Sequence, residues 1–139
     1  MFDSGLASAD EADVVAAIEE WAATEARAAA RRLAAIGELV RRRCSDDERA
    51  HWACDSWDAA AAEVSATLGI THGRASGEMQ LSQALRHRLP RVAELFMAGR
   101  LGYRVCQAIA GRTDLVTDDE ALARIDAAVA DAAVTWGAL

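Results

Sequence analysis

Apolar residues recur every three or four positions along most of the chain, which is the spacing of amphipathic α-helices. The longest such stretch is 9–43, with an apolar stripe of Val14, Val15, Ile18, Trp21, Ala22, Ala29, Leu33, Ile36 and Val40. Acidic residues begin this stretch and three arginines at 41–43 end it, and both favour the helix dipole. Gly37 weakens the prediction slightly, because glycine is a poor helix former.

The centre of the chain predicts two helices joined by a tight turn. The first begins at Asp55 or Ser56 and ends before Gly69, which suits the glycine position that follows a helix. Thr71 is the predicted N-cap of the second, which covers about 72–87.

The other predicted helices are a short one capped by Ser45, one from Pro90 to Ala98–Gly99, one over about 103–110, and one from a capping box at 117–120 through about Val134. No stretch has the alternation of a strand. The predicted fold class is therefore all-α. We expect one helical domain over 1–139, with a long helix at 9–43, a helix-turn-helix-like pair at 56–88 and C-terminal helices at 90–136.

The long helix is longer than the domain that it belongs to. Its residues would span about 50 Å, whereas a chain of this length has an expected radius of gyration of about 14 Å. We therefore predict a homodimer that forms through this helix. The alternative is that the later helices pack along its whole length.

Composition changes this picture little. Alanine supplies 34 of the 139 residues, so the helices are expected to pack closely through small side chains. No apolar run reaches the ~20 residues of a membrane span, and the N-terminus lacks the features of a secretion signal. Three cysteines form no disulfide framework, which predicts reduced thiols and a cytoplasmic protein without membrane contact.

Charge is distributed unevenly along the chain. The net charge of −7 combines −7 over residues 1–69 (7 Arg, 14 acids), +5 over 70–112 (7 Arg, 2 Glu) and −5 over 113–139 (1 Arg, 6 acids). A basic segment of this kind is compatible with phosphate binding. Alternatively, the acidic segments pair with it inside the molecule.

The turn at 68–71 fits a DNA-binding helix-turn-helix, with Leu68, Gly69 and Ile70 before the Thr71 cap and Ala75, Met79, Leu85 and Leu89 as the buried face. In that frame double-stranded DNA is the predicted partner. The predicted DNA-binding residues are Thr71, His72, Arg74, Ser76, Gln80, Arg86, Arg88 and Arg91. Arg100, Arg104 and Arg112 could extend the surface, or be ordinary solvated charges. Gly73 and Gly77 contact nothing specific, and Glu78 would repel phosphate if it faced a duplex.

Other chemistry is not indicated. There is no phosphate-binding glycine loop and no nucleophilic serine motif, so we predict no catalytic residue, no cofactor and no small-molecule substrate. His51 and Cys54 have the spacing of a ligand pair, but Cys44 is too distant to join them, and no metal is predicted. Trp21, Trp52, Trp57 and Trp136 are interpreted as core or interface anchors rather than base-stacking platforms.

Three segments together resemble the actinobacterial 13E12-repeat proteins, whose shared N-terminal region is known as domain of unknown function 222. They are "ARRLAAIGEL", "AAAEVSATLGITHGRAS" and "LSQALRHRLPRVAELFMAGRLGYRVCQAIAGRT". The resemblance runs from about Val14 to Trp136 and is most specific at Leu89–Leu101. It implies an association with DNA, because in that family an HNH endonuclease domain commonly follows. The chain has no HNH segment, so no catalytic residue is carried over.

The leading hypothesis is a non-catalytic domain that binds or targets DNA. The competing hypothesis is a helical module for oligomerisation or for binding a protein partner, without affinity for DNA.

Overall fold

The computed structural model describes residues 2, 5–44 and 50–136, with the side chains of this part except those of 50–55, 134 and 136. The described helices are α1 (Glu11–Arg43), α2 (Ala50–Leu68), α3 (His72–His87), α4 (Pro90–Met97), α5 (Tyr103–Thr113) and α6 (Asp119–Trp136). No strand occurs among these residues, and the all-α class is confirmed. None of the described helices is long and apolar enough to cross a membrane.

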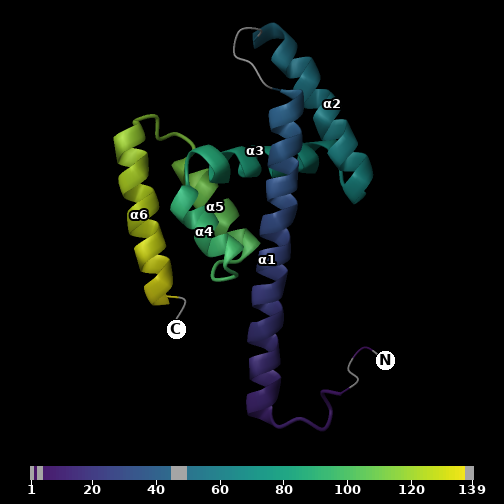
Figure 1. Ribbon diagram of the computed structural model, residues 1–139, viewed down its shortest axis with the longest axis vertical. Helices are drawn as coiled ribbons and strands as arrows, with labels where there is room; N and C mark the ends of the chain where they lie inside the picture. Colours follow the sequence, from purple (N-terminus) through teal and green to yellow (C-terminus); the bar gives the residue numbers. More distant parts are fainter. Residues whose placement is uncertain (1, 3–4, 45–49, 137–139) are drawn as a thin grey trace.

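The long helix α1 forms as the sequence predicts. The Asp10 carboxylate caps it by accepting the backbone N–H of Asp13 at 2.8 Å, and the arginines at 41–43 occupy its last turn. Only its C-terminal half belongs to the core, because the buried residues begin at Ala26. The N-terminal half extends beyond every other helix (Figure 1).

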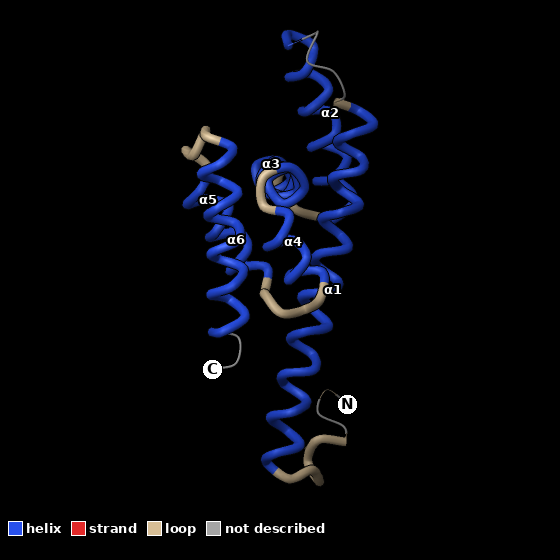
Figure 2. Tube along the Cα trace, turned by 60° about the vertical axis from the view of Figure 1, so that its left-hand side comes forward, coloured by secondary structure: helices blue, strands red, loops and turns tan. Residues whose placement is uncertain are grey.

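Helix α3 lies at the centre of the fold. Helix α2 packs beside the covered half of α1, and α3 packs against both, crossing α1 (Figure 1). Helices α4 and α5 contact the same α3, and α6 forms the outer layer against α4. Seen nearly along its axis, α3 separates the α1–α2 side from the α5–α6 side (Figure 2).

One buried cluster joins these helices. Its largest fully buried side chains are Leu33, Met79, Leu89, Val92, Phe96 and Cys106. Helices α1 and α3 approach closely where both have small residues, Gly37 and Ser82. At this point the Ser82 hydroxyl donates a 2.9 Å hydrogen bond to the Leu33 carbonyl. Gly37 is therefore a point of close contact between α1 and α3. The sequence indicated only that this glycine lowers helix propensity.

Two helix starts differ from prediction. Helix α2 begins at Ala50 and passes through Asp55 and Ser56 without a break, because a capping residue does not interrupt a helix whose preceding residues are also helical. Helix α6 is capped by Asp118 rather than Thr117, since the Asp118 carboxylate accepts the Ala121 N–H at 3.3 Å. The predicted short helix capped by Ser45 lies partly outside the described residues.

Candidate nucleic-acid interface

The predicted turn between α2 and α3 is present. Gly69 has φ +66°, the left-handed conformation that favours glycine. The Ile70 N–H donates to the Ser65 carbonyl at 3.1 Å, and the Ser65 hydroxyl donates to the Ile70 carbonyl. The Thr71 hydroxyl accepts the Arg74 N–H at 3.2 Å, so Thr71 is the N-cap as predicted.

The buried face of α3 is also as predicted. Ala75 and Met79 have no exposed surface, and Leu85 is 6% exposed. Glu78 belongs to this face and is 6% exposed. Its carboxylate therefore does not face solvent, so the condition under which Glu78 was expected to repel phosphate is not met.

The solvent face of α3 carries His72, Ser76 and Gln80 at four-residue spacing, with Gly73 and Gly77 between them. Two of the three polar side chains have partners on α2. The Trp57 indole donates to the Ser76 hydroxyl at 2.9 Å, and His72 Nε2 lies 3.5 Å from the Asp58 carboxylate. Gln80 is exposed and is the side chain of this face most available to an external partner.

The four predicted DNA-binding arginines do not form one surface. Arg86 lies 3.7 Å from Glu38 of α1. Arg88 turns inward and donates to the carbonyls of Thr113 and Val116, at 2.8 and 2.9 Å. Arg91 is exposed at the start of α4, and Arg74 is exposed in the first turn of α3. Periodicity could not separate these positions, because the neighbours of α3 decide which side each arginine occupies.

Helix α5 lies beside α3 and contributes a second part of the surface. The Tyr103 hydroxyl donates to the Glu78 carboxylate at 3.1 Å at one end, and Arg88 reaches Thr113 at the other. A hollow of about 230 Å³ lies between the helices, lined by Gly77, Gln80, Leu81, Ala84, Gln107, Ala110, Gly111 and Asp114. The first residue of α5 therefore contacts the N-terminal half of α3, and the last residue of α5 is bonded by Arg88, which directly follows α3. The two helices run in the same direction.

We call Arg74, Gly77 and Gln80 of α3 with Arg104 and Gln107 of α5 the α3–α5 face. Each of these residues is exposed. Arg74 lies one helical turn before Glu78, whose carboxylate accepts the Tyr103 hydroxyl, so Arg74 is on the side of α3 toward α5. Arg104 lies one helical turn before Gln107, which lines the hollow between α3 and α5. Neither arginine has a carboxylate partner among the described residues.

A buried polar cluster supports this face from beneath. Glu78 receives the Tyr103 hydrogen bond and lies 3.6 Å from Arg32 of α1. Burial raises the pKa of the Tyr103 hydroxyl, and the negative charge of Glu78 raises it further. The hydroxyl therefore remains a donor at neutral pH, and the cluster links α1, α3 and α5.

The remaining candidate chemistry is sparse. Burial raises the pKa of the Cys106 thiol to about 12, so this thiol is not a nucleophile at neutral pH. No cluster of three or more potential metal ligands occurs in the described part of the chain. The side chains of His51, Cys54, Trp52 and Trp136 lie outside it. Trp57 is half-buried, whereas Trp21 is 65% exposed and does not belong to the core of the monomer.

Comparison with known proteins identifies the family. The family model described as "Domain of unknown function (DUF222)" matches residues 20–139. The chain belongs to this family. No solved structure matches the DUF222 chain.

Relatives that match the chain include proteins of Mycobacterium tuberculosis. "Uncharacterized protein Rv2100" is 58% identical over 134 residues, which are 96% of this chain and 24% of the relative. "Uncharacterized protein Rv3776" and "Uncharacterized protein in est 3'region" are both 55% identical over 134 residues, covering 26% and 38% of their lengths. The chain therefore spans between about a quarter and two fifths of these relatives. Neither the family description nor these names indicate a catalytic activity.

Proposed function

We propose that this DUF222 domain binds double-stranded DNA through the α3–α5 face and has no catalytic role of its own. The observation that carries the proposal is the charge of this face. Arg74 and Arg104 are exposed without carboxylate partners among the described residues, and the single acidic residue of α3 is buried. Guanidinium groups bind phosphate well because their donors match its oxygens.

The two glycines of α3 are compatible with close approach of a DNA backbone. A Cβ built on Gly73 or Gly77 would meet no atom within 4 Å, so the fold does not require glycine at either position. Each glycine nevertheless weakens the helix by up to about 1 kcal/mol relative to alanine. We propose that the glycines offset this cost by letting a DNA phosphate approach the peptide groups of α3, because no side chain covers the helix at these positions.

The same geometry favours weak sequence specificity. Gln80 and Gln107 are the amide side chains of the face and can bond to base edges, whereas the arginines bind phosphate. Most of the affinity would therefore come from charge. The resemblance to 13E12-repeat proteins extends the proposal to proteins in which an HNH nuclease domain follows this domain, where the domain would deliver the nuclease to DNA.

A salt titration of duplex binding tests this function. We expect the domain to bind a fluorescent 20-bp duplex at micromolar concentration in 50 mM salt and to lose most of this affinity by 200 mM. Arg74→Ala with Arg104→Ala should weaken binding about tenfold or more at low salt. It should also reduce the log–log salt slope by about 2, since each arginine neutralises one phosphate.

Arg124→Ala is the matched control, because Arg124 is an exposed arginine on the outer helix α6. Its affinity and salt slope should equal those of the wild type. Absence of any complex at micromolar protein in 50 mM salt would contradict the proposal. Equal losses in Arg124→Ala and the double variant would show that the charge is not localised to the α3–α5 face.

A second candidate function is self-association, and a different observation favours it. The N-terminal half of α1, which we call the arm (residues 11–25), exposes apolar side chains far from the core. Val15, Ile18 and Trp21 are 54%, 63% and 65% exposed, and Leu6 beside them is 45% exposed. Together they present on the order of 450 Å² of apolar surface, a size that is often functional.

A second copy of the chain is the proposed occupant. Two such arms would bury on the order of 900 Å² through these side chains, and the alanines between them bring the contact to the ~1,000 Å² of a specific interface. A twofold contact needs only one self-complementary surface. The long helix predicted from the sequence thus leads to the same proposal of a homodimer, now restricted to the arm.

Sedimentation equilibrium tests this candidate. We expect a species of twice 14.8 kDa at tens of micromolar, and a monomer for Ile18→Ser with Trp21→Ser. Leu115→Ser is the control, since Leu115 is 91% exposed in a loop and should leave the mass unchanged. A wild-type monomer at this concentration would exclude the dimer without affecting the proposal on DNA.

A further inference from the structure

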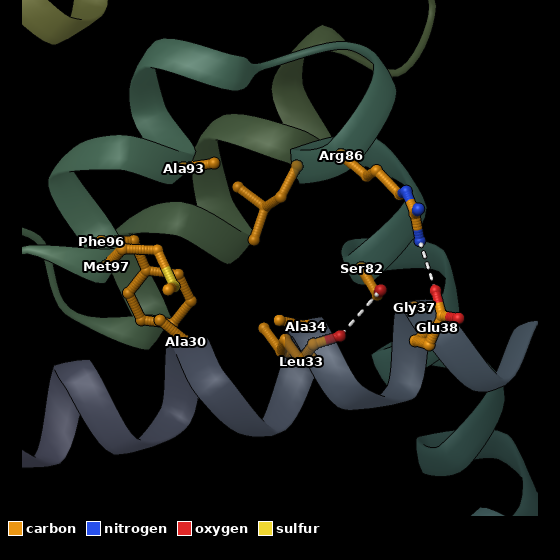
Figure 3. A pocket seen from close by; sticks show the side chains of 11 residues that line it. Ala30, Leu33, Ala34, Gly37, Glu38, Ser82, Arg86, Ala93, Phe96 and Met97 are labelled. Carbon is orange, nitrogen blue, oxygen red and sulfur yellow. Dashed lines mark hydrogen bonds and ion pairs between the residues drawn. The ribbon is translucent and has the colours of Figure 1, made fainter. Parts of the chain in front are cut away.

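A second hollow lies on the other side of α3, between α1, α3 and α4. It has a volume of about 370 Å³, and its residues do not belong to the α3–α5 face or to the arm. Figure 3 shows Leu33 and Ala34 of α1 on one wall and Phe96 and Met97 of α4 opposite. We call it the α1–α4 groove.

The groove exists because small residues line the place where the helices diverge. Helices α1 and α3 touch at Gly37 and Ser82. Beside this contact, the short side chains of Ala34 on α1 and Ala93 on α4 leave space unfilled. Its floor is apolar and belongs to the core, since Leu33 and Phe96 are 2% and 1% exposed. Surface hollows of this volume with a mainly apolar lining are typical of small-molecule sites.

One end of the groove carries two charged side chains. Glu38 and Arg86 form this rim, 3.7 Å apart. Arg41 and Arg42 also bind Glu38, with contacts of 2.7 and 2.9 Å. Hydrogen bonds from Arg41 and Arg42 lower the pKa of Glu38 to about 2, so it is ionised at neutral pH. Because Arg41 and Arg42 hydrogen-bond the Glu38 carboxylate, its charge is compensated without Arg86.

Arg86 is the rim residue that is able to turn toward a ligand. Its distance to Glu38 exceeds that of a hydrogen bond, whereas the other two arginines satisfy the carboxylate at hydrogen-bond distance. The Arg86 side chain is 40% exposed and stands at the mouth of the groove (Figure 3). A ligand carboxylate would therefore compete with one long ion pair, and not with a hydrogen bond, for the Arg86 donors.

From this arrangement we infer that the α1–α4 groove binds a small amphiphilic anion, with an apolar body between α1 and α4 and a carboxylate at Arg86. The volume suits an aliphatic body of about ten carbon atoms or an aromatic acid of similar size. Apolar burial would supply most of the affinity, and the guanidinium would distinguish a carboxylate from an uncharged or cationic head group.

Binding of decanoate to the full chain tests this inference, with decanol and decylamine as matched probes. Amide chemical shifts should move on addition of decanoate around residues 30–38, 82–86 and 93–97. Affinity should fall in the order decanoate, decanol, decylamine. Arg86→Gln should lower the ratio of decanoate affinity to decanol affinity at least fivefold, while decanol still binds. Arg124→Gln should leave both affinities unchanged.

Blocking the groove supplies an independent readout. Ala34 is exposed, so Ala34→Trp can fill the groove without replacing a core side chain and should abolish binding of both decanoate and decanol. No shift changes with millimolar decanoate would overturn the inference. So would shifts confined to residues 6–25, which would assign the probe to the arm, or an unchanged preference for carboxylate in Arg86→Gln.

Discussion

Gly37→Ala is expected to destabilise the domain by about 2 kcal/mol, although glycine to alanine within a helix ordinarily stabilises. A Cβ at this position would lie within van der Waals overlap of the Ser82 hydroxyl oxygen. To relieve the overlap, α1 and α3 must separate or the buried bond from Ser82 to the Leu33 carbonyl must break. Urea unfolding of the variant and the wild type measures the difference.

Gly73→Ala is the matched control for this substitution. Gly73 is also helical, and a Cβ there meets no atom within 4 Å, so the same change should stabilise by about 0.5–1 kcal/mol. In a Ser82→Ala background, Gly37→Ala should be nearly neutral, because the overlapping oxygen is gone. A Gly37→Ala variant as stable as the wild type would contradict the close contact between α1 and α3.

Asp126→Ala is expected to destabilise by about 2–4 kcal/mol. Asp126 belongs to α6 and is 3% exposed, and its two carboxylate oxygens accept the N–H groups of Arg91 and Val92, at 3.0 and 3.1 Å. These donors are in the first turn of α4, whose own N-cap residue, Leu89, has no side-chain acceptor. Without Asp126, buried N–H groups at a helix start would lose their partner.

Asp131→Ala provides the comparison on the same helix. Asp131 is exposed, and its replacement should change the free energy of unfolding by less than about 0.5 kcal/mol. Asp126→Asn retains an acceptor oxygen and should fall between the two. Equal stabilities of the Asp126→Ala and Asp131→Ala variants in urea unfolding would show that the cap contributes nothing.

The sequence predicted the helices well because their signals are local. Apolar spacing defined α1, and Thr71 and Pro90 marked the starts of α3 and α4, where the structure has them. The buried face of α3 followed from the same periodicity. Errors occurred where several capping residues competed, at the starts of α2 and α6, since a cap changes helix stability by only about 1 kcal/mol.

The candidate site was predicted less well. Residues 71–80 of the predicted set gather at the N-terminal half of α3, but Arg86 and Arg88 face α1 and α5 instead. Arg104 was considered only as an extension of the surface, because nothing in its spacing relates α5 to α3. Tyr103 and Glu78 make that connection, through a hydrogen bond between residues 25 positions apart.

The sequence by itself determined the helical class, the length of α1 and the positive charge of the central segment, because these depend on neighbouring residues and on composition. Only the tertiary structure decided that Glu78 is buried and that Arg88 bonds to backbone carbonyls inside the molecule. It also decided that Asp126 caps α4 and that Gly37 contacts α3. Each of these depends on which helix packs against which. That choice is made by the combined shape and burial of many side chains, which no single periodicity records.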